Sequence, residues 1–185
     1  MPPTRRAQPP LSRDRILDVA LAIATDEGLV ALSMRRIATE LGTGAMSLYN
    51  HVPDKDALLS GLAERVLDDV EVVTGGDWRD TGAAWATSLR RAILAHRPLV
   101  PVIVSPQYPE PMAAAVGALT TALTDGGLAP ADAAAVTAVL GRYVAGSAML
   151  DAAAGRRRGA TRAELDRIFQ VGLDALLDGL PSHLG

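Results

Sequence analysis

Residues 33–52 read SMRRIATELGTGAMSLYNHV and contain the most informative local signals in the chain. Ser33 can cap a short helix, and Gly42 can end it in the left-handed conformation that glycine adopts readily. A second short helical segment, within 43–51, must end before Pro53, because proline disfavours helix in the residue that precedes it. Two short helices joined by a glycine turn predict a helix-turn-helix, the motif that places its second helix in the major groove of DNA.

The second helix of this pair would present short and hydrogen-bonding side chains, which suit base edges in a major groove. These side chains belong to Ala45, Met46, Ser47, Tyr49, Asn50 and His51. Arg35, Arg36 and Lys55 flank the segment and are positioned to contact phosphates. Outside this pattern, a lone Tyr-x-His pair such as Tyr49 and His51 would more often pack against a neighbouring helix.

The composition favours helices around this motif. Of 185 residues, 49% are hydrophobic but only 3% are aromatic, and alanine is abundant, which suits closely packed helices better than a sheet. The chain has no cysteine, which excludes disulfides and thiol catalysis, and its three histidines lack the paired spacing of metal ligands. We therefore expect an all-α cytoplasmic protein without a metal or other cofactor.

Apolar periodicity, capping residues, glycines and prolines together predict about nine helices. Besides the short pair, they cover residues 13–27, 54–73, 77 to about 97, a brief turn within 99–104, 111–124, 130–154 and 162–178. We expect residues 1–9 to form a flexible basic arm, residues 10–56 a helix-turn-helix DNA-binding domain, and residues 57–185 a ligand-binding and dimerisation domain, with helix 54–73 as the connector. The longest uninterrupted apolar run is far too short to cross a membrane, so we expect no membrane segment.

The predicted helices 130–154 and 162–178 are apolar on more than one side. One side would serve the core of the domain, and the excess indicates a second buried face, as in a four-helix bundle made by two copies. A homodimer also suits the DNA hypothesis, since two reading helices related by a two-fold axis can contact half-sites about 34–36 Å apart.

Residues 41–58, LGTGAMSLYNHVPDKDAL, resemble the signature L-G-x5-L-Y-x-H-[VF]-x-x-K-x-x-L of TetR-family transcriptional repressors. With the preceding helices, this resemblance covers residues 13–62. The part from Asp77 to Leu128 looks like the C-terminal domain of the tetracycline-repressor branch. Asn50 departs from the aromatic residue often found there, and Ala45 and Met46 replace more polar groove residues, so the operator sequence does not follow from the family.

The resemblance implies a repressor that binds a palindromic double-stranded DNA operator as a homodimer and is released by a small-molecule effector. It places Ser33, Arg35 and Arg36 at the start of a helix that touches the DNA backbone and groove edge, and it places Lys55 on a phosphate. It also implies that effector binding in the C-terminal domain shifts helix 54–73 and separates the two reading helices.

Polar and aromatic residues on otherwise apolar helices are the candidate effector contacts. They are Trp85, Ser88, His96, Tyr108, Met112, Thr120, Tyr143 and Ser147. The few aromatic residues favour an aliphatic or mixed effector over a stacked planar one. His96 could equally be a solvent-facing residue at the end of its helix.

Two other classes of function stay open at this point. A constitutive DNA-binding protein would have the same helix-turn-helix but no effector. A small all-α enzyme would need a convergent set of acid, base or nucleophile, and no such set is evident in the sequence. We therefore expect that the protein is not an enzyme.

Overall fold

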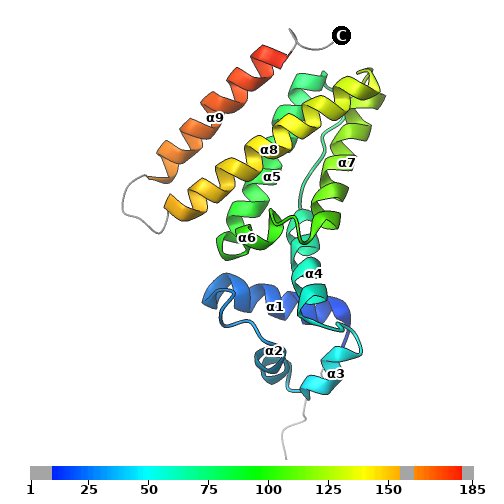
Figure 1. Ribbon diagram of the computed structural model, residues 1–185, viewed down its shortest axis with the longest axis vertical. Helices are drawn as coiled ribbons and strands as arrows, with labels where there is room; N and C mark the ends of the chain where they lie inside the picture. The colour runs from blue at the N-terminus through cyan, green and yellow to red at the C-terminus, as the bar shows by residue number, and fades with distance from the viewer. Residues whose placement is uncertain (1–9, 155–160, 181–185) are drawn as a thin grey trace, which may run out of the picture. The chain divides into compact units, whose positions relative to one another are not determined.

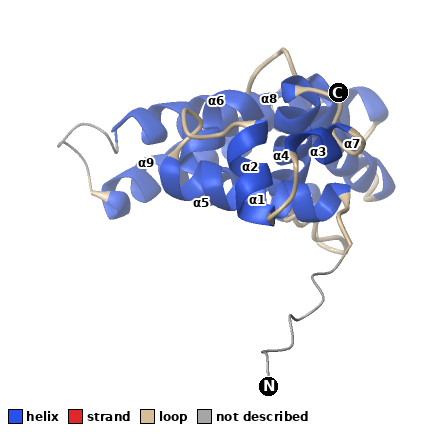
Figure 2. Ribbon diagram, turned by 90° about the horizontal axis from the view of Figure 1, so that it is seen from below, coloured by secondary structure: helices blue, strands red, loops and turns tan. Residues whose placement is uncertain are grey.

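The computed structural model describes residues 10–154 and 161–180, and every regular element in those ranges is helical (Figures 1 and 2). The helices are α1 (Arg13–Glu27), α2 (Met34–Leu41), α3 (Ala45–Tyr49), α4 (Lys55–Leu67), α5 (Trp78–Ala95), the 3-10 turn η1 (Arg97–Leu99), α6 (Val100–Ile103), α7 (Pro109–Asp125), α8 (Pro130–Ala154) and α9 (Arg162–Gly179). The predicted all-α class is confirmed. The predicted arm, residues 1–9, lies outside the described residues.

The ends of the first two helices are set by the residues that the sequence indicates. The Ser33 hydroxyl accepts a hydrogen bond from the Arg36 backbone N–H at 3.1 Å and so caps α2. Gly42 ends α2 with φ 65° and ψ 32°, a left-handed conformation that glycine adopts without a steric penalty. The chain can therefore turn sharply between α2 and α3.

Helix α4 is shorter than predicted, because it ends at Leu67 and not at residue 73. Asp68 and Asp69 follow that end, where their charge is unfavourable beside the negative end of the helix dipole. Beyond them, the Glu71 backbone N–H donates to Ser88 Oγ at 3.0 Å, so this segment satisfies its backbone outside a helix.

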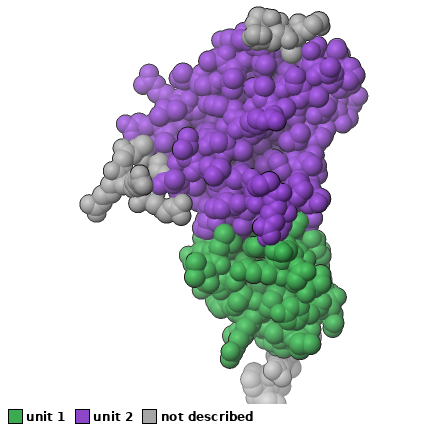
Figure 3. All heavy atoms as spheres, in the orientation of Figure 1, with its two compact units in different colours: residues 1–62 green, residues 63–185 purple. Residues whose placement is uncertain are grey.

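The chain divides into two compact units, residues 1–62 and 63–185 (Figure 3). The division falls within α4. In the first unit, α1, α2, α3 and the start of α4 bury a common aliphatic core that includes Ile16, Ile37, Leu48 and Leu58. Gly61 lets α4 cross α1 closely, since a Cβ at this position would stand 2.8 Å from Leu17 Cδ2.

In the second unit, α5 packs against α7, α8 and α9. Asp77 caps α5 as predicted, its carboxylate accepting from the Asp80 backbone N–H at 2.8 Å. Trp85 and Leu89 on α5 are fully buried, together with Leu119 on α7 and Leu140 on α8. Helix α7 begins at Pro109, two residues before its predicted start at 111, because proline fits the first turn of a helix.

Helix α9 begins at the capping box that the sequence predicts. The Thr161 hydroxyl accepts from the Glu164 backbone N–H at 3.3 Å, and the Glu164 carboxylate accepts from the Thr161 backbone N–H at 2.7 Å. These backbone and hydroxyl hydrogen bonds from Thr161 lower the pKa of Glu164 below its ordinary value. The start of the helix is therefore fixed locally.

Over Pro130–Ala153, helix α8 is long enough and apolar enough to cross a membrane, with a mean hydropathy of 1.4. Counting uninterrupted apolar residues in the sequence does not identify α8 as long and apolar enough to cross a membrane. A single helix of this kind is weak evidence for a membrane, because helices that pack inside soluble proteins have the same composition.

Candidate DNA-binding and ligand-binding sites

Helix α3 has one side buried in the first unit and the other side open. Leu48 is fully buried and Val52, just beyond the helix, is 1% exposed, so these two side chains anchor the segment. Met46 is 78% exposed and Tyr49 is 43% exposed. The other predicted reading residues lie beside them: Asn50 and His51 are exposed, whereas Ala45 and Ser47 are half-buried. The structure therefore brings the six predicted reading residues onto one anchored segment.

The neighbouring arginines of α2 have different surroundings. Arg36 donates to Glu40 at 2.7 Å and to Glu27 of α1 at 2.8 Å. These hydrogen bonds, the one to Glu40 first, raise the pKa of the Arg36 guanidinium above its ordinary value. The Arg35 side chain is exposed and forms no ion pair within the described ranges. Of the two predicted phosphate contacts on α2, Arg35 is exposed and has no ion pair within the described ranges, while Arg36 links α2 to α1.

Two further predicted DNA contacts lie at the starts of helices. The Ser33 hydroxyl is exposed while it caps α2. Lys55 is exposed at the first position of α4, and the carboxylate of Asp54 caps that helix through the Ala57 backbone N–H at 2.7 Å. The positive ends of helix dipoles favour phosphate at both places.

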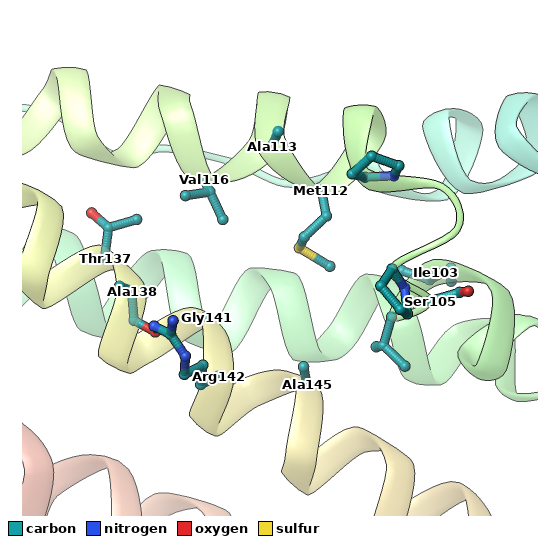
Figure 4. A pocket seen from close by; sticks show the side chains of 13 residues that line it. Ile103, Ser105, Met112, Ala113, Val116, Thr137, Ala138, Gly141, Arg142 and Ala145 are labelled. Atoms are coloured by element: carbon teal, nitrogen blue, oxygen red, sulfur yellow. The ribbon is translucent and has the colours of Figure 1, made fainter.

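The second unit contains a cavity of about 460 Å³ between α6, α7 and α8 (Figure 4). Most of its wall is aliphatic, and Met112 and Val116 point into it from α7. The full lining consists of Ile103, Val104, Ser105, Pro106, Pro109, Met112, Ala113, Val116, Thr137, Ala138, Gly141, Arg142 and Ala145.

Three polar side chains interrupt this apolar wall: Ser105, Thr137 and Arg142. The Thr137 hydroxyl donates to the Ala133 carbonyl at 2.8 Å and keeps its lone pairs as acceptors. Arg142 is exposed and donates through Nη1 to the Ala138 carbonyl at 3.1 Å. Its other N–H groups can meet an acceptor, so the cavity suits a largely apolar molecule with a polar or anionic group.

Of the eight predicted effector contacts, the structure brings only Met112 to this cavity. The remaining seven, Trp85, Ser88, His96, Tyr108, Thr120, Tyr143 and Ser147, do not line it. Several of their polar groups bond to the backbone instead: the Thr120 hydroxyl donates to Val116, the Tyr143 hydroxyl donates to Phe169, and Ser88 Oγ accepts from Glu71. His96 is the residue that ends α5.

Sequence reasoning missed most of the cavity because it looked for polar and aromatic side chains. The space arises from small residues on α8, since Thr137, Gly141 and Ala145 recur every fourth position and lie on one side of the helix. They face α6, α7 and the proline-containing segment 104–109. Small residues at helical spacing beside a proline-broken segment were the signal that could have located it.

An exposed apolar surface lies on the last two helices. Met149 and Leu150 of α8 are 53% and 73% exposed, while Ile168 and Val171 of α9 are 66% and 62% exposed. Large apolar side chains exposed on two helices that contact each other suit an interaction surface. No group of three or more metal-ligating side chains occurs among the residues that the structure describes.

Two protein-family profiles match the chain. Residues 16–62 match the bacterial regulatory proteins of the tetR family, and residues 73–165 match the tetracycline-repressor-like C-terminal domain. The HTH-type transcriptional repressor DrrR1 of Streptomyces coeruleorubidus is 43% identical over 98 residues, which are 51% of this chain and 35% of the relative. The chain spans 35% to 61% of the length of the first curated relatives that it matches.

Solved structures share the fold over nearly the whole chain. The TetR-family protein ActR of Streptomyces coelicolor, in complex with (S)-DNPA, is 33% identical with a TM-score of 0.79 and covers 95% of this chain and 100% of its own. BioQ, solved with its natural double-stranded DNA operator, is 26% identical with a TM-score of 0.75 and covers 94% of this chain and 100% of its own. With both halves matched, the chain belongs to the tetR family of bacterial transcriptional regulators.

Proposed function

We propose that this protein is a transcriptional repressor that binds a palindromic operator as a homodimer in the cytoplasm and is released by a small-molecule effector. The observation that supports it most is the set of exposed side chains of Met46, Tyr49, Asn50 and His51, on a segment held in place by the buried Leu48 and Val52. A rigidly anchored segment with open side chains is what base reading in a groove requires.

In this proposal, α3 reads bases while nearby residues hold phosphates. Arg35 and Lys55, which have no ion pair within the described ranges, supply the charges, and Ser33 supplies a hydroxyl. Arg36 acts as a positioning residue through its ion pairs with α1 and α2. Residues 1–55 carry seven basic and six acidic side chains, so affinity depends on a few placed contacts and not on bulk charge.

The homodimer would form through α8 and α9. The exposed Met149, Leu150, Ile168 and Val171 provide the apolar surface that a second copy would cover in a four-helix bundle. A two-fold axis through that bundle would present two copies of α3 to successive half-sites of the operator.

The effector would occupy the cavity lined by α6, α7 and α8. Its volume of about 460 Å³ falls within the usual range for small-molecule sites. The aliphatic wall with Arg142 favours an aliphatic or mixed molecule that carries an acceptor group. Because α4 begins in the first unit and ends in the second, a shift of α4 would transmit binding to α3. A full switch needs about 5.5 kcal/mol of differential affinity.

Selection of bound DNA from a random library tests the DNA-binding part of this proposal. We expect enrichment of a palindrome, and we expect Tyr49→Ala to abolish it while the protein stays folded. Failure to enrich any sequence would contradict a repressor. Operator binding that persists across a broad panel of metabolites would favour the constitutive DNA-binding protein, and turnover that survives Tyr49→Ala would favour an enzyme.

A further inference from the structure

The second unit contains another hollow, of about 250 Å³, between α5 and α9. Four arginines line it: Arg90 and Arg91 of α5, Arg97 of η1, and Arg162 of α9. Asp166 is the only acidic residue among the described residues of its lining, and the buried Asp151 also pairs with Arg90, so the four arginines and these two carboxylates have a formal charge of +2 in a chain whose net charge is −3. None of its lining residues belongs to the cavity between α6, α7 and α8.

Three of these arginines have guanidinium N–H groups that are free to bind another acceptor. The nearest carboxylate to Arg91 is that of Glu71 at 3.9 Å, and Arg162 Nε lies 3.9 Å from Asp166 Oδ2. Both distances exceed hydrogen-bond length. Arg97 is half-buried and has no ion pair within the described ranges.

The fourth arginine forms a rigid wall of the pocket. Arg90 is 9% exposed and is held by Asp151 at 2.8 Å and by Asp166 at 2.7 Å. Its guanidinium carbon lies 4.6 Å from the centre of the Phe169 ring. Its Nε–H is buried and has no partner among the residues that the structure describes. A buried guanidinium fixed by two carboxylates distinguishes this pocket from a solvated patch of surface arginines.

We propose that this pocket, which we call the arginine pocket, binds the phosphate group of a small molecule. Guanidinium groups match the geometry of phosphate oxygens and form charge-assisted hydrogen bonds with them. A dianion would offset the formal +2 charge, whereas a single carboxylate would offset half of it. Asp166 is engaged by Arg90, which reduces its repulsion of an anion.

The arginine pocket stays open in the proposed dimer. Arg162, Asp166 and Gln170 of α9 line it and follow one another at four-residue spacing. The exposed Ile168 and Val171 lie roughly 140–160° around the helix from Asp166, at 100° per residue. A second copy that covers Ile168 and Val171 therefore leaves the pocket accessible, and phosphate binding does not depend on the effector site.

Equilibrium dialysis of the full chain against labelled inorganic phosphate, at constant ionic strength in chloride, tests the proposal. We expect saturable binding of one phosphate per chain, and binding about tenfold or more weaker in the double variant Arg97→Ala, Arg162→Ala. Arg167→Ala is the matched control, because Arg167 is exposed on α9 but does not line the pocket. Thermal unfolding should show a phosphate-dependent rise in Tm in the native protein and the control only.

Competition with glycerol phosphate distinguishes the two possible sources of the bound phosphate group, a phosphorylated metabolite and free inorganic phosphate. Tighter binding of the ester identifies a phosphorylated metabolite as the ligand, and tighter binding of inorganic phosphate identifies the free ion. Absence of saturable binding overturns the proposal. Equal affinity in the double variant and in Arg167→Ala overturns it as well.

Discussion

A side chain at Gly172 of α9 would overlap the hydroxyl of Tyr143 of α8. That hydroxyl donates to the Phe169 carbonyl at 2.7 Å, and the Tyr143 ring stacks on the Phe169 ring at 5.3 Å between centroids. Burial of the Tyr143 hydroxyl in this contact raises the pKa of Tyr143 above its ordinary value. Tyr143, Phe169 and Gly172 therefore set the register of α9 on α8, and this register determines which apolar residues face outward.

Gly172→Ala should lower the free energy of unfolding by about 1–3 kcal/mol, because the added methyl group forces Tyr143 or α9 to move. Urea denaturation measures the change. Gly117→Ala is the matched control: nothing lies within 4 Å of a Cβ at Gly117, so this variant should gain about 0.5–1 kcal/mol from helix propensity. Equal effects of the two substitutions would contradict the packing of α8 on α9.

Arg35→Ala and Arg36→Ala should have different consequences although the residues are adjacent. Arg35 has no ion pair within the described ranges, so its loss should weaken operator binding, reduce the salt slope by about 1 and leave the Tm unchanged. Arg36 joins Glu27 and Glu40, so its loss should lower the Tm. Lys55→Ala should behave like Arg35→Ala. Fluorescence anisotropy over a range of salt concentrations, with thermal unfolding, separates the two roles, and an unchanged salt slope would argue against a phosphate contact.

Glu164→Gln should reduce stability at pH 7 more than at acidic pH. Hydrogen bonds from Thr161 depress the pKa of Glu164 below 4.5 in the folded protein. A depressed pKa contributes stability that is fully present above the unfolded value and is lost as the pH falls through the folded value. The difference in urea midpoint between the native protein and Glu164→Gln should therefore shrink below pH 4.5. A difference that is constant from pH 7 to pH 3 would exclude this ionic part of the capping box.

Local signals in the sequence were sufficient to predict the helices, but they were not sufficient to predict the residues that line the cavity. Ser33, Gly42 and the Thr161–Glu164 box act on neighbouring residues, so their effects can be predicted from spacing alone. The end of α4 was mispredicted because the Glu71–Ser88 hydrogen bond joins residues 17 positions apart. The pairing of Arg36 with Glu27 likewise depends on how two helices meet.

Filling the cavity between α6, α7 and α8 should abolish the response to an effector while operator binding persists. Ala138→Phe places a large ring in space that small residues leave free, and Arg142→Ala should weaken effectors that carry an anionic group. Ser147→Ala is the control, since Ser147 does not line this cavity. Effector titrations of the operator complex measure the response. If Ser147→Ala lost the response and Ala138→Phe kept it, the effector site would lie among the residues expected from the sequence.

Ile168→Asp combined with Val171→Asp should convert the protein to a monomer without unfolding it. Both side chains are more than 60% exposed, whereas Phe169, Leu173 and Leu177 on the same helix are buried and hold α9 to its own unit. A buried charge in a bundle of two copies is costly, so the dimer should dissociate. Loss of the second reading helix should weaken operator binding about 100-fold or more, because simultaneous engagement of two half-sites is lost. Sedimentation velocity and anisotropy measure the two effects, with Arg167→Ala as the control. A double variant that stays dimeric would place the interface on another surface, and a monomer with unchanged operator affinity would show that dimerisation does not position the reading helices.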